Sequence, residues 1–82
     1  MGRLPRDLSG RDLARALRRY GYEVTRETGS HMRLTTPQGG EHHVTILDHA
    51  SLRIGTLAGI LADVATHFKI DRSALAAELF ER

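Results

Sequence analysis

The 82-residue chain contains no cysteine and no tryptophan, and its aromatic residues are only two tyrosines and two phenylalanines. Without cysteine there are no disulfides, thiolate metal ligands or thiol nucleophiles, so histidine and carboxylates are the remaining ligand types. The sequence also has no apolar run of membrane-spanning length and no apolar segment of a signal peptide near its start. We therefore expect a cytoplasmic protein without a membrane partner. Its length suits one domain, residues 1–82, with a single modest core.

The basic residues are unevenly distributed, and eleven of the twelve are arginine. Residues 1–33 hold eight arginines against four acidic residues, whereas residues 34–82 hold four basic residues against six acidic ones. Arginine binds phosphate in a bidentate manner, so this asymmetry points to an anionic partner for the first part of the chain. A solvated face of ordinary charges is the alternative interpretation.

A helix is predicted to begin at Ser9, whose side chain is suited to capping, with Asp12 in the first turn. Apolar residues recur at helical spacing after it, and Gly21 is a typical left-handed end. On the opposite side, a basic stripe is formed by Arg11, Arg15, Arg18 and Arg19. Such a stripe can follow a phosphate backbone, although long arginine side chains are also ordinary helix surface.

From Tyr22 the apolar period changes to two, which is typical of strands with one buried face. Tyr22 and Val24 are expected to point inward, followed by Met32 and Leu34 in a second strand and by Val44 and Ile46 in a third. The segment 37–40, Pro-Gln-Gly-Gly, is a turn signal between the last two strands. The opposite parity predicts that His31, Arg33, His43 and Thr45 point away from the core.

The rest of the chain predicts two further helices. Thr56 is interpreted as the cap of a longer helix and Asp71 as the cap of a short final one. The apolar face of the longer helix is expected to comprise Leu57, Ile60, Leu61, Val64 and Phe68, and that of the final helix Leu75, Leu79 and Phe80. The predicted fold is an α+β sandwich of order α-β-β-β-α plus a short C-terminal helix, with a three-stranded antiparallel sheet, helices on one face and the other face open.

The open face would carry the chemistry. Imidazole titrates near neutrality, so an exposed His31 can take a proton from a hydroxyl and later return one. The 2′-hydroxyl of RNA, once deprotonated, can attack the adjacent phosphorus without a metal, and Arg33 could stabilise the resulting charge. Ser30 could orient the phosphate or His31. The alternative is that His31 is an ordinary exposed strand residue.

A metal site is not favoured. His42, His43 and His49 suggest one at first, but adjacent histidines in a strand face opposite ways, and no carboxylate stands at a recurring ligand spacing. His67 near a helix end is interpreted as a favourable cation at the negative helix terminus. We therefore predict no metal and no cofactor.

Several segments together resemble one protein family. Their order and spacing over about residues 8 to 68 are similar to the HicA toxins, also called YcfA-like. The segments are LSGRDLARAL at 8–17, GYEV at 21–24, GSH at 29–31, VTI at 44–46 followed by Asp48 and His49, and LRIGTLAGIL at 52–61.

The resemblance implies a fold like that of double-stranded-RNA-binding domains (dsRBD-like) and an mRNA interferase, an endoribonuclease that arrests growth by cleaving transcripts. It implies that His31 is the catalytic histidine and that a HicB-like antitoxin covers the active face. Beside it, the residue-based reading assigns RNA contacts to Ser30, Arg33, Arg11, Arg15, Gly29 and His49. A non-catalytic RNA-binding module, and a regulator whose only partner is a protein, remain the alternatives.

Overall fold

The computed structural model describes residues 4–80 of the chain. In chain order the elements are α1 (Gly10–Ala16), a 3-10 helix η1 (Leu17–Tyr20), β1 (Glu23–Thr28), β2 (His31–Thr36), β3 (His42–Leu47), α2 (Ile54–Phe68) and α3 (Arg72–Phe80). The strands form one antiparallel sheet in the order β1-β2-β3. The predicted α+β class, the strand order and the short last helix are confirmed.

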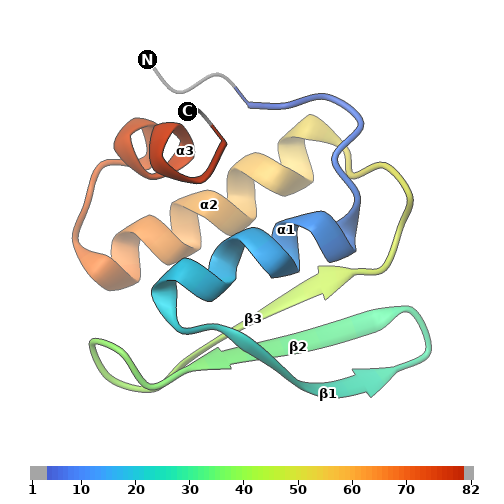
Figure 1. The fold of residues 1–82 in the computed structure, drawn as a ribbon, viewed down its shortest axis with the longest axis horizontal. Coiled ribbons are helices and arrows are strands. Elements are labelled where there is room, and N and C mark those ends of the chain that lie inside the picture. Colours follow the sequence, from blue (N-terminus) through green and yellow to red (C-terminus); the bar gives the residue numbers. More distant parts are fainter. Residues whose placement is uncertain (1–3, 81–82) are drawn as a thin grey trace.

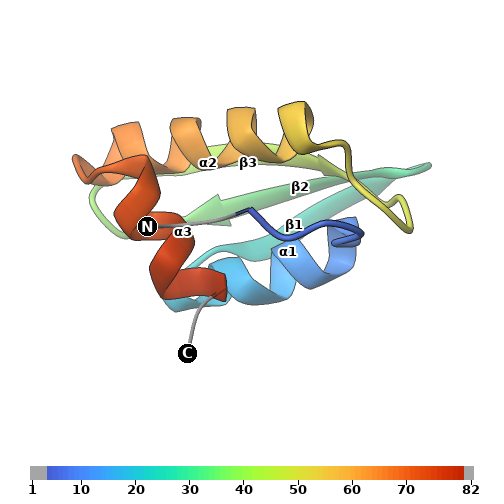
Figure 2. The same ribbon diagram turned by 90° about the horizontal axis from the view of Figure 1, so that it is seen from above.

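The sheet forms one layer and the helices lie over one of its faces (Figure 1). Seen from above, α1 runs along the β1 side and α2 along the β3 side, so the middle strand lies beneath the space between them (Figure 2). The helix α3 packs against α2 on the side away from the sheet (Figure 1). The opposite face of the sheet has no helix of the described residues over it, as the sequence predicted.

The core lies between the sheet and the helices. Residues from β2, β3 and the helices meet there with Tyr22, which directly precedes β1, and they include most of the apolar positions expected from the periodicity. The largest fully buried side chains are Leu13, Leu17, Tyr22, Met32, Leu34, Thr36, Ile46, Leu57, Leu61, Val64 and Leu75. The burial of alternate residues in β2 and β3 fixes which side chains remain on the open face.

The first helix begins as the sequence predicts. The Asp12 amide donates a hydrogen bond of 3.0 Å to the Ser9 hydroxyl, which satisfies one of the free amides at the helix start. The helix tightens into η1 and ends at Gly21, whose φ of 82° lies in the left-handed region. Asp71 likewise accepts hydrogen bonds from the amides of Ser73 and Ala74, confirming it as the cap of α3.

Gly10 is the point where α1 meets the end of β3. Its amide donates to the His49 carbonyl at 2.9 Å, and a Cβ built on Gly10 would lie 1.8 Å from the carbonyl oxygen of Leu47. No side chain fits there without movement of one of the two backbones. A glycine at this position therefore allows the close approach that joins the first helix to the third strand.

Two predictions about these elements need correction. Val24 lies opposite Leu34 on the helix side of the sheet, but it is 42% exposed because neither helix covers it. The helix α2 begins at Ile54 and not after Thr56. Its N-cap is Arg53, with extended backbone and no side-chain capping hydrogen bond. In the part of the chain that the structure describes, no helix combines the length and apolar character needed to cross a membrane.

Candidate nucleic-acid interface

His31 is the first residue of β2 and follows a two-residue turn. Thr28 and His31 are cross-strand partners, so Gly29 and Ser30 form the whole connection. Gly29 has a φ of 58°, a left-handed conformation that suits glycine at the first position of a tight hairpin. Within residues 4–80, the exposed His31 side chain makes no hydrogen bond or ion pair. Its imidazole is therefore available to a ligand.

Two arginines lie beside His31 on the open face. Arg33 is two residues further along β2, and the register places it between Arg26 of β1 and Thr45 of β3. Cross-strand partners point to the same face, so Arg26 and Arg33 stand next to each other. Two like charges in this position lower the stability of the fold, and a bound anion would relieve their repulsion. The pair therefore attracts anions to this surface.

Sequence reasoning missed Arg26. Strict alternation from Tyr22 and Val24 assigns residue 26 to the buried face. The register between β1 and β2 shifts between Val24 and Arg26, so that Thr25 is an extra residue and Arg26 turns outward. An arginine at a position that alternation assigns to the core was the signal that such a bulge was present.

The carboxylates of Glu27 and Asp48 hold Arg11 at the same end of the sheet. The Arg11 guanidinium donates to Asp48 at 3.2 Å and to Glu27 at 3.0 Å. These contacts raise the pKa of Arg11, chiefly through the hydrogen bond and charge of Asp48 and then through Glu27. The Asp48 amide also donates to the Ser30 carbonyl at 2.7 Å. Arg11 thus braces the turn that precedes His31.

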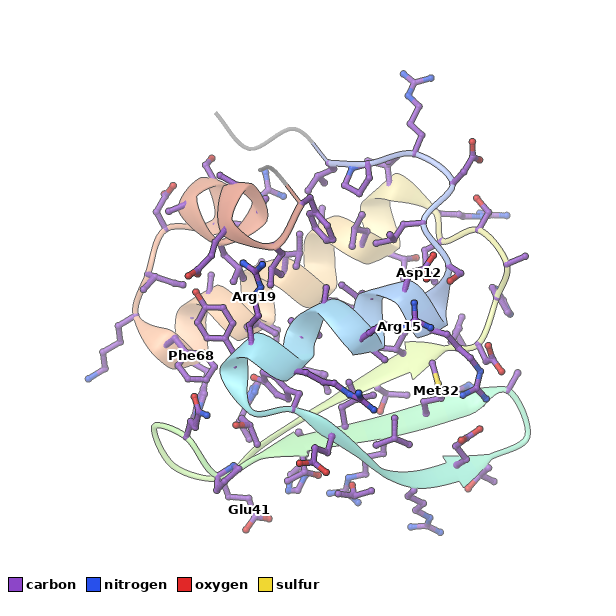
Figure 3. The ribbon with its side chains drawn as sticks, viewed as in Figure 1. Asp12, Arg15, Arg19, Met32, Glu41 and Phe68 are labelled. Atoms are coloured by element: carbon purple, nitrogen blue, oxygen red, sulfur yellow. The ribbon has the colours of Figure 1, made fainter. Side chains whose placement is uncertain are left out.

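Arg15 and Arg18 of the predicted stripe line a groove on the helix side of the sheet together with Arg11. Arg15 pairs with Asp12 at 3.1 Å, and in Figure 3 it lies at the same end of the molecule as Met32. Arg19 donates to the Glu78 carbonyl at 2.7 Å, which ties η1 to α3. His31 and Met32 are consecutive strand residues and point to opposite faces. The structure therefore brings Arg33 and Arg26 beside His31, but not Arg15.

His49 lies in the loop that leaves β3 beside the turn. Leu47 is the cross-strand partner of His31, and the next residue, Asp48, contacts Ser30. The exposed His49 follows directly and lines a cavity of about 420 Å³ with Ser51, Arg53 and Thr56 of the same segment. A second imidazole therefore belongs to the same end of the sheet as His31.

The three remaining histidines are engaged in structural contacts. His42 shares hydrogen bonds with the Tyr22 hydroxyl at 2.6 Å and with Asp63 at 3.3 Å, and its ring stacks on His67 at 4.3 Å. His43 points the other way, as predicted, and contacts Thr35 and Glu41.

The ring of His67, predicted to act as a helix-end cation, also shares a hydrogen bond with the Gln38 carbonyl at 2.9 Å. Among residues 4–80, no three potential ligands are grouped in a way that would hold a metal ion.

Comparison with known families decides the assignment. Residues 10–65 match the sequence model of the family described as HicA toxin of bacterial toxin-antitoxin. The chain belongs to the HicA toxin family. Neither the curated proteins nor the solved structures contain a match to it.

The part of the chain that matches the HicA model runs from the start of α1 to Ala65 in α2, so it includes His31, Arg33 and His49 and leaves α3 outside. A HicA protein is the toxin of a toxin-antitoxin pair, which implies an antitoxin as its partner.

Proposed function

We propose that this HicA protein is an endoribonuclease that cleaves mRNA without a metal ion, with His31 as its catalytic residue. The observation that carries the proposal is an exposed imidazole, bonded to no other described residue, on an open sheet face beside two arginines. The engaged histidines of the chain serve as the contrast, since each already has at least one ring nitrogen hydrogen-bonded to a neighbour.

In the proposed step, His31 takes the proton of a ribose 2′-hydroxyl. The 2′ oxygen then forms a bond to the adjacent phosphorus, and the bond from phosphorus to the 5′ oxygen breaks. The departing 5′ oxygen takes up a proton from water, which leaves a 2′,3′-cyclic phosphate and a 5′-hydroxyl end. General base catalysis of this kind contributes about 10²- to 10⁴-fold to a rate.

The surrounding groups would bind the phosphates. Arg33, with Arg26 across the strand pair, is placed to stabilise the negative charge that builds on the phosphorus oxygens. The Ser30 hydroxyl and the backbone of Gly29 lie next to His31 in the chain and would orient the scissile phosphate. His49, Arg11 and Arg15 would contact the flanking nucleotides, since a strand of RNA is long enough to pass from the open face around the turn.

The antitoxin would be HicB-like and would cover the open face, because His31 can act only where RNA reaches it. This contact is separate from catalysis, so it can be tested with a protein that no longer cleaves RNA.

The experiment is induced expression of the chain and of its His31→Ala variant in a bacterial host, followed by assay of both purified proteins on labelled RNA with EDTA present. We expect the parent to arrest growth and to leave 2′,3′-cyclic phosphate ends, and His31→Ala to lower cleavage about 10²- to 10⁴-fold. His67→Gln, at the other end of the sheet, is the matched control and should retain toxicity.

A substrate with 2′-deoxyribose at the cleaved position should stay intact, because it lacks the attacking hydroxyl. Equal toxicity of His31→Ala and the parent would overturn the catalytic assignment. RNA binding that weakens steeply with salt but leaves every transcript intact would instead support the non-catalytic RNA-binding module.

A further inference from the structure

A groove lies between the first helix and the edge of the sheet, on the face opposite His31. It has a volume of about 250 Å³, with one wall formed by α1 and η1 and the other by β1. In Figures 1 and 3 this side of the molecule faces the viewer. Its lining comprises Arg11, Ala14, Arg15, Arg18, Tyr22, Glu23, Val24 and Met32.

The floor of the groove is apolar. Ala14, Tyr22 and Met32 are buried beneath it, and Val24 stands at its lip with 42% of its surface exposed. Val24 occupies a position on the helix side of the sheet, where a residue of this kind is normally covered. Val24 therefore offers an open aliphatic side chain against which a partner side chain of similar character can pack.

The rim of the groove is basic. Arg11 and Arg15 each have carboxylate partners, whereas Arg18 has no ion pair among residues 4–80. The lining holds three guanidinium groups against the single carboxylate of Glu23. Phosphates alone would gain nothing from the apolar floor. The combination of aliphatic floor and basic rim instead complements a peptide with aliphatic and acidic residues.

The backbone beside the groove is also unpaired. β1 is an edge strand of the described sheet, with β2 on one side only. An edge strand presents free amide and carbonyl groups to which an extended peptide can add as a further strand. Six exposed residues in succession, with no helix over them, leave this edge accessible.

We propose that this groove binds an extended, acidic segment of a partner protein. The segment adds along the free edge of β1, places an aliphatic side chain against the exposed Val24, and pairs its carboxylates with Arg15 and Arg18. Membership of a toxin-antitoxin family implies a partner protein. The lining of the groove indicates the chemistry of the partner segment that would bind there. The bound segment withdraws Arg15 from RNA while it leaves His31 uncovered.

The test uses the full chain carrying His31→Ala, so that its outcome does not depend on whether the protein cleaves RNA. The probe is a fluorescein-labelled peptide of ten alternating glutamate and valine residues, with a matched peptide of alternating lysine and valine. Binding is measured by fluorescence anisotropy. The backbone amide signals that shift on binding are assigned by NMR.

We expect the glutamate peptide to bind and the lysine peptide not to bind, with amide shifts centred on Ala14, Arg18 and Val24. Arg18→Glu should weaken binding about tenfold, because it places a carboxylate against the acidic peptide. Arg72→Glu makes the same charge change on α3 and should alter the affinity by less than about twofold, as expected for a distant surface charge.

The amide shifts of the chain carrying His31→Ala alone keep the test decisive even if the further change Arg18→Glu impairs folding. Shifts centred on Arg33 and Thr45 would overturn the proposal, and so would equal weakening by the two charge reversals or the absence of binding. The proposal would also be overturned if the peptide did not bind and a single-stranded RNA bound in a way that required Arg18 and Val24. That result would assign the groove to nucleic acid.

Discussion

Both ends of the sheet carry histidine side chains, but the imidazole is unengaged at one end and held by neighbouring residues at the other. At one end His31 projects from the start of β2 with an exposed ring that no described residue engages. At the other end His42 and His67 stack on each other, and both share hydrogen bonds with neighbouring elements. In Figure 3, Met32 marks the first end and Phe68 the second.

The difference separates histidines that stabilise the fold from one that is free to bind a ligand. The rings of His42 and His67 connect β3, α2 and the turn at Gln38, so proton transfer through them would break contacts that hold the fold. The His31 ring makes no such contact and contributes little to the free energy of folding. A ligand can therefore bind the His31 imidazole without breaking a contact that stabilises the fold.

The largest expected effect at the His31 end comes from Gly10→Ala. The added Cβ would overlap the Leu47 carbonyl, so helix and strand must separate, at a cost of about 3 kcal/mol in the free energy of unfolding. Urea denaturation measures this loss. Because Leu47 is the partner of His31, RNA cleavage by the folded fraction should fall as well.

Gly59→Ala is the matched control for that variant. Gly59 lies in α2 with no atom within 4 Å of an added Cβ, so the substitution should stabilise the protein by about 1 kcal/mol through helix propensity. Equal stability of Gly10→Ala and the parent would mean that the contact between α1 and β3 is not close in solution.

His42→Ala tests the opposite end. It removes the partner of the buried Tyr22 hydroxyl and the stacking surface of His67, which should cost about 2 kcal/mol in the free energy of unfolding. His43→Ala, its neighbour on the open face, should cost under about 1 kcal/mol, because its Glu41 partner is exposed. If His43→Ala is the more destabilising variant, the proposed division between the two ends is wrong.

Alkaline pH should weaken the same end. Burial raises the pKa of Tyr22 to about 12, with a further contribution from the charge of Asp63. Burial, followed by Glu78, likewise raises the pKa of Tyr20 to about 12. Both tyrosines ionise near pH 10 in the unfolded chain. Their contribution to the free energy of unfolding is therefore complete below pH 10 and is lost as the pH rises toward 12.

The measurement is the midpoint of thermal unfolding between pH 8 and pH 12 for the parent and for Tyr22→Phe. The variant should lose less stability over this range, because Tyr20 is then the one tyrosine left to ionise. An identical slope for the two proteins would contradict the assigned role of Tyr22.

The smallest effect is expected from Arg26→Gln. Relief of the repulsion with Arg33 should raise the free energy of unfolding by about 0.2 to 1 kcal/mol. RNA affinity should fall, and the slope of its logarithm against that of salt concentration should decrease by about one if Arg26 contacts a phosphate. Arg72→Gln is the control and should leave the salt slope unchanged.

Alternation and capping were enough to predict most of the fold. Met32, Leu34, Val44 and Ile46 alternate without interruption, and the structure buries all four. Ser9 and Asp71 cap their helices as predicted, because a side-chain oxygen at a helix start is a local feature.

The remaining features depend on contacts between distant parts of the chain. The bulge at Thr25 reverses the parity of Arg26, and only the pairing with β2 reveals it. α2 begins two residues before Thr56, since Arg53 forms its cap without the side-chain signal on which the prediction relied. His67 meets His42 through the packing of α2 on β3, which no local pattern contains. The face on which a strand residue lies could be predicted where the alternation held, as for His31 and Arg33, and not where the bulge interrupted it, as for Arg26.

The turn of Gly29 and Ser30 has a consequence for control of the toxin. A connection of two residues between paired strands is itself too short to fold over His31 and withdraw to expose it. The turn thus leaves the His31 side chain exposed without any movement of the turn. Under the proposed function, restraint of His31 falls to the antitoxin that the family membership implies.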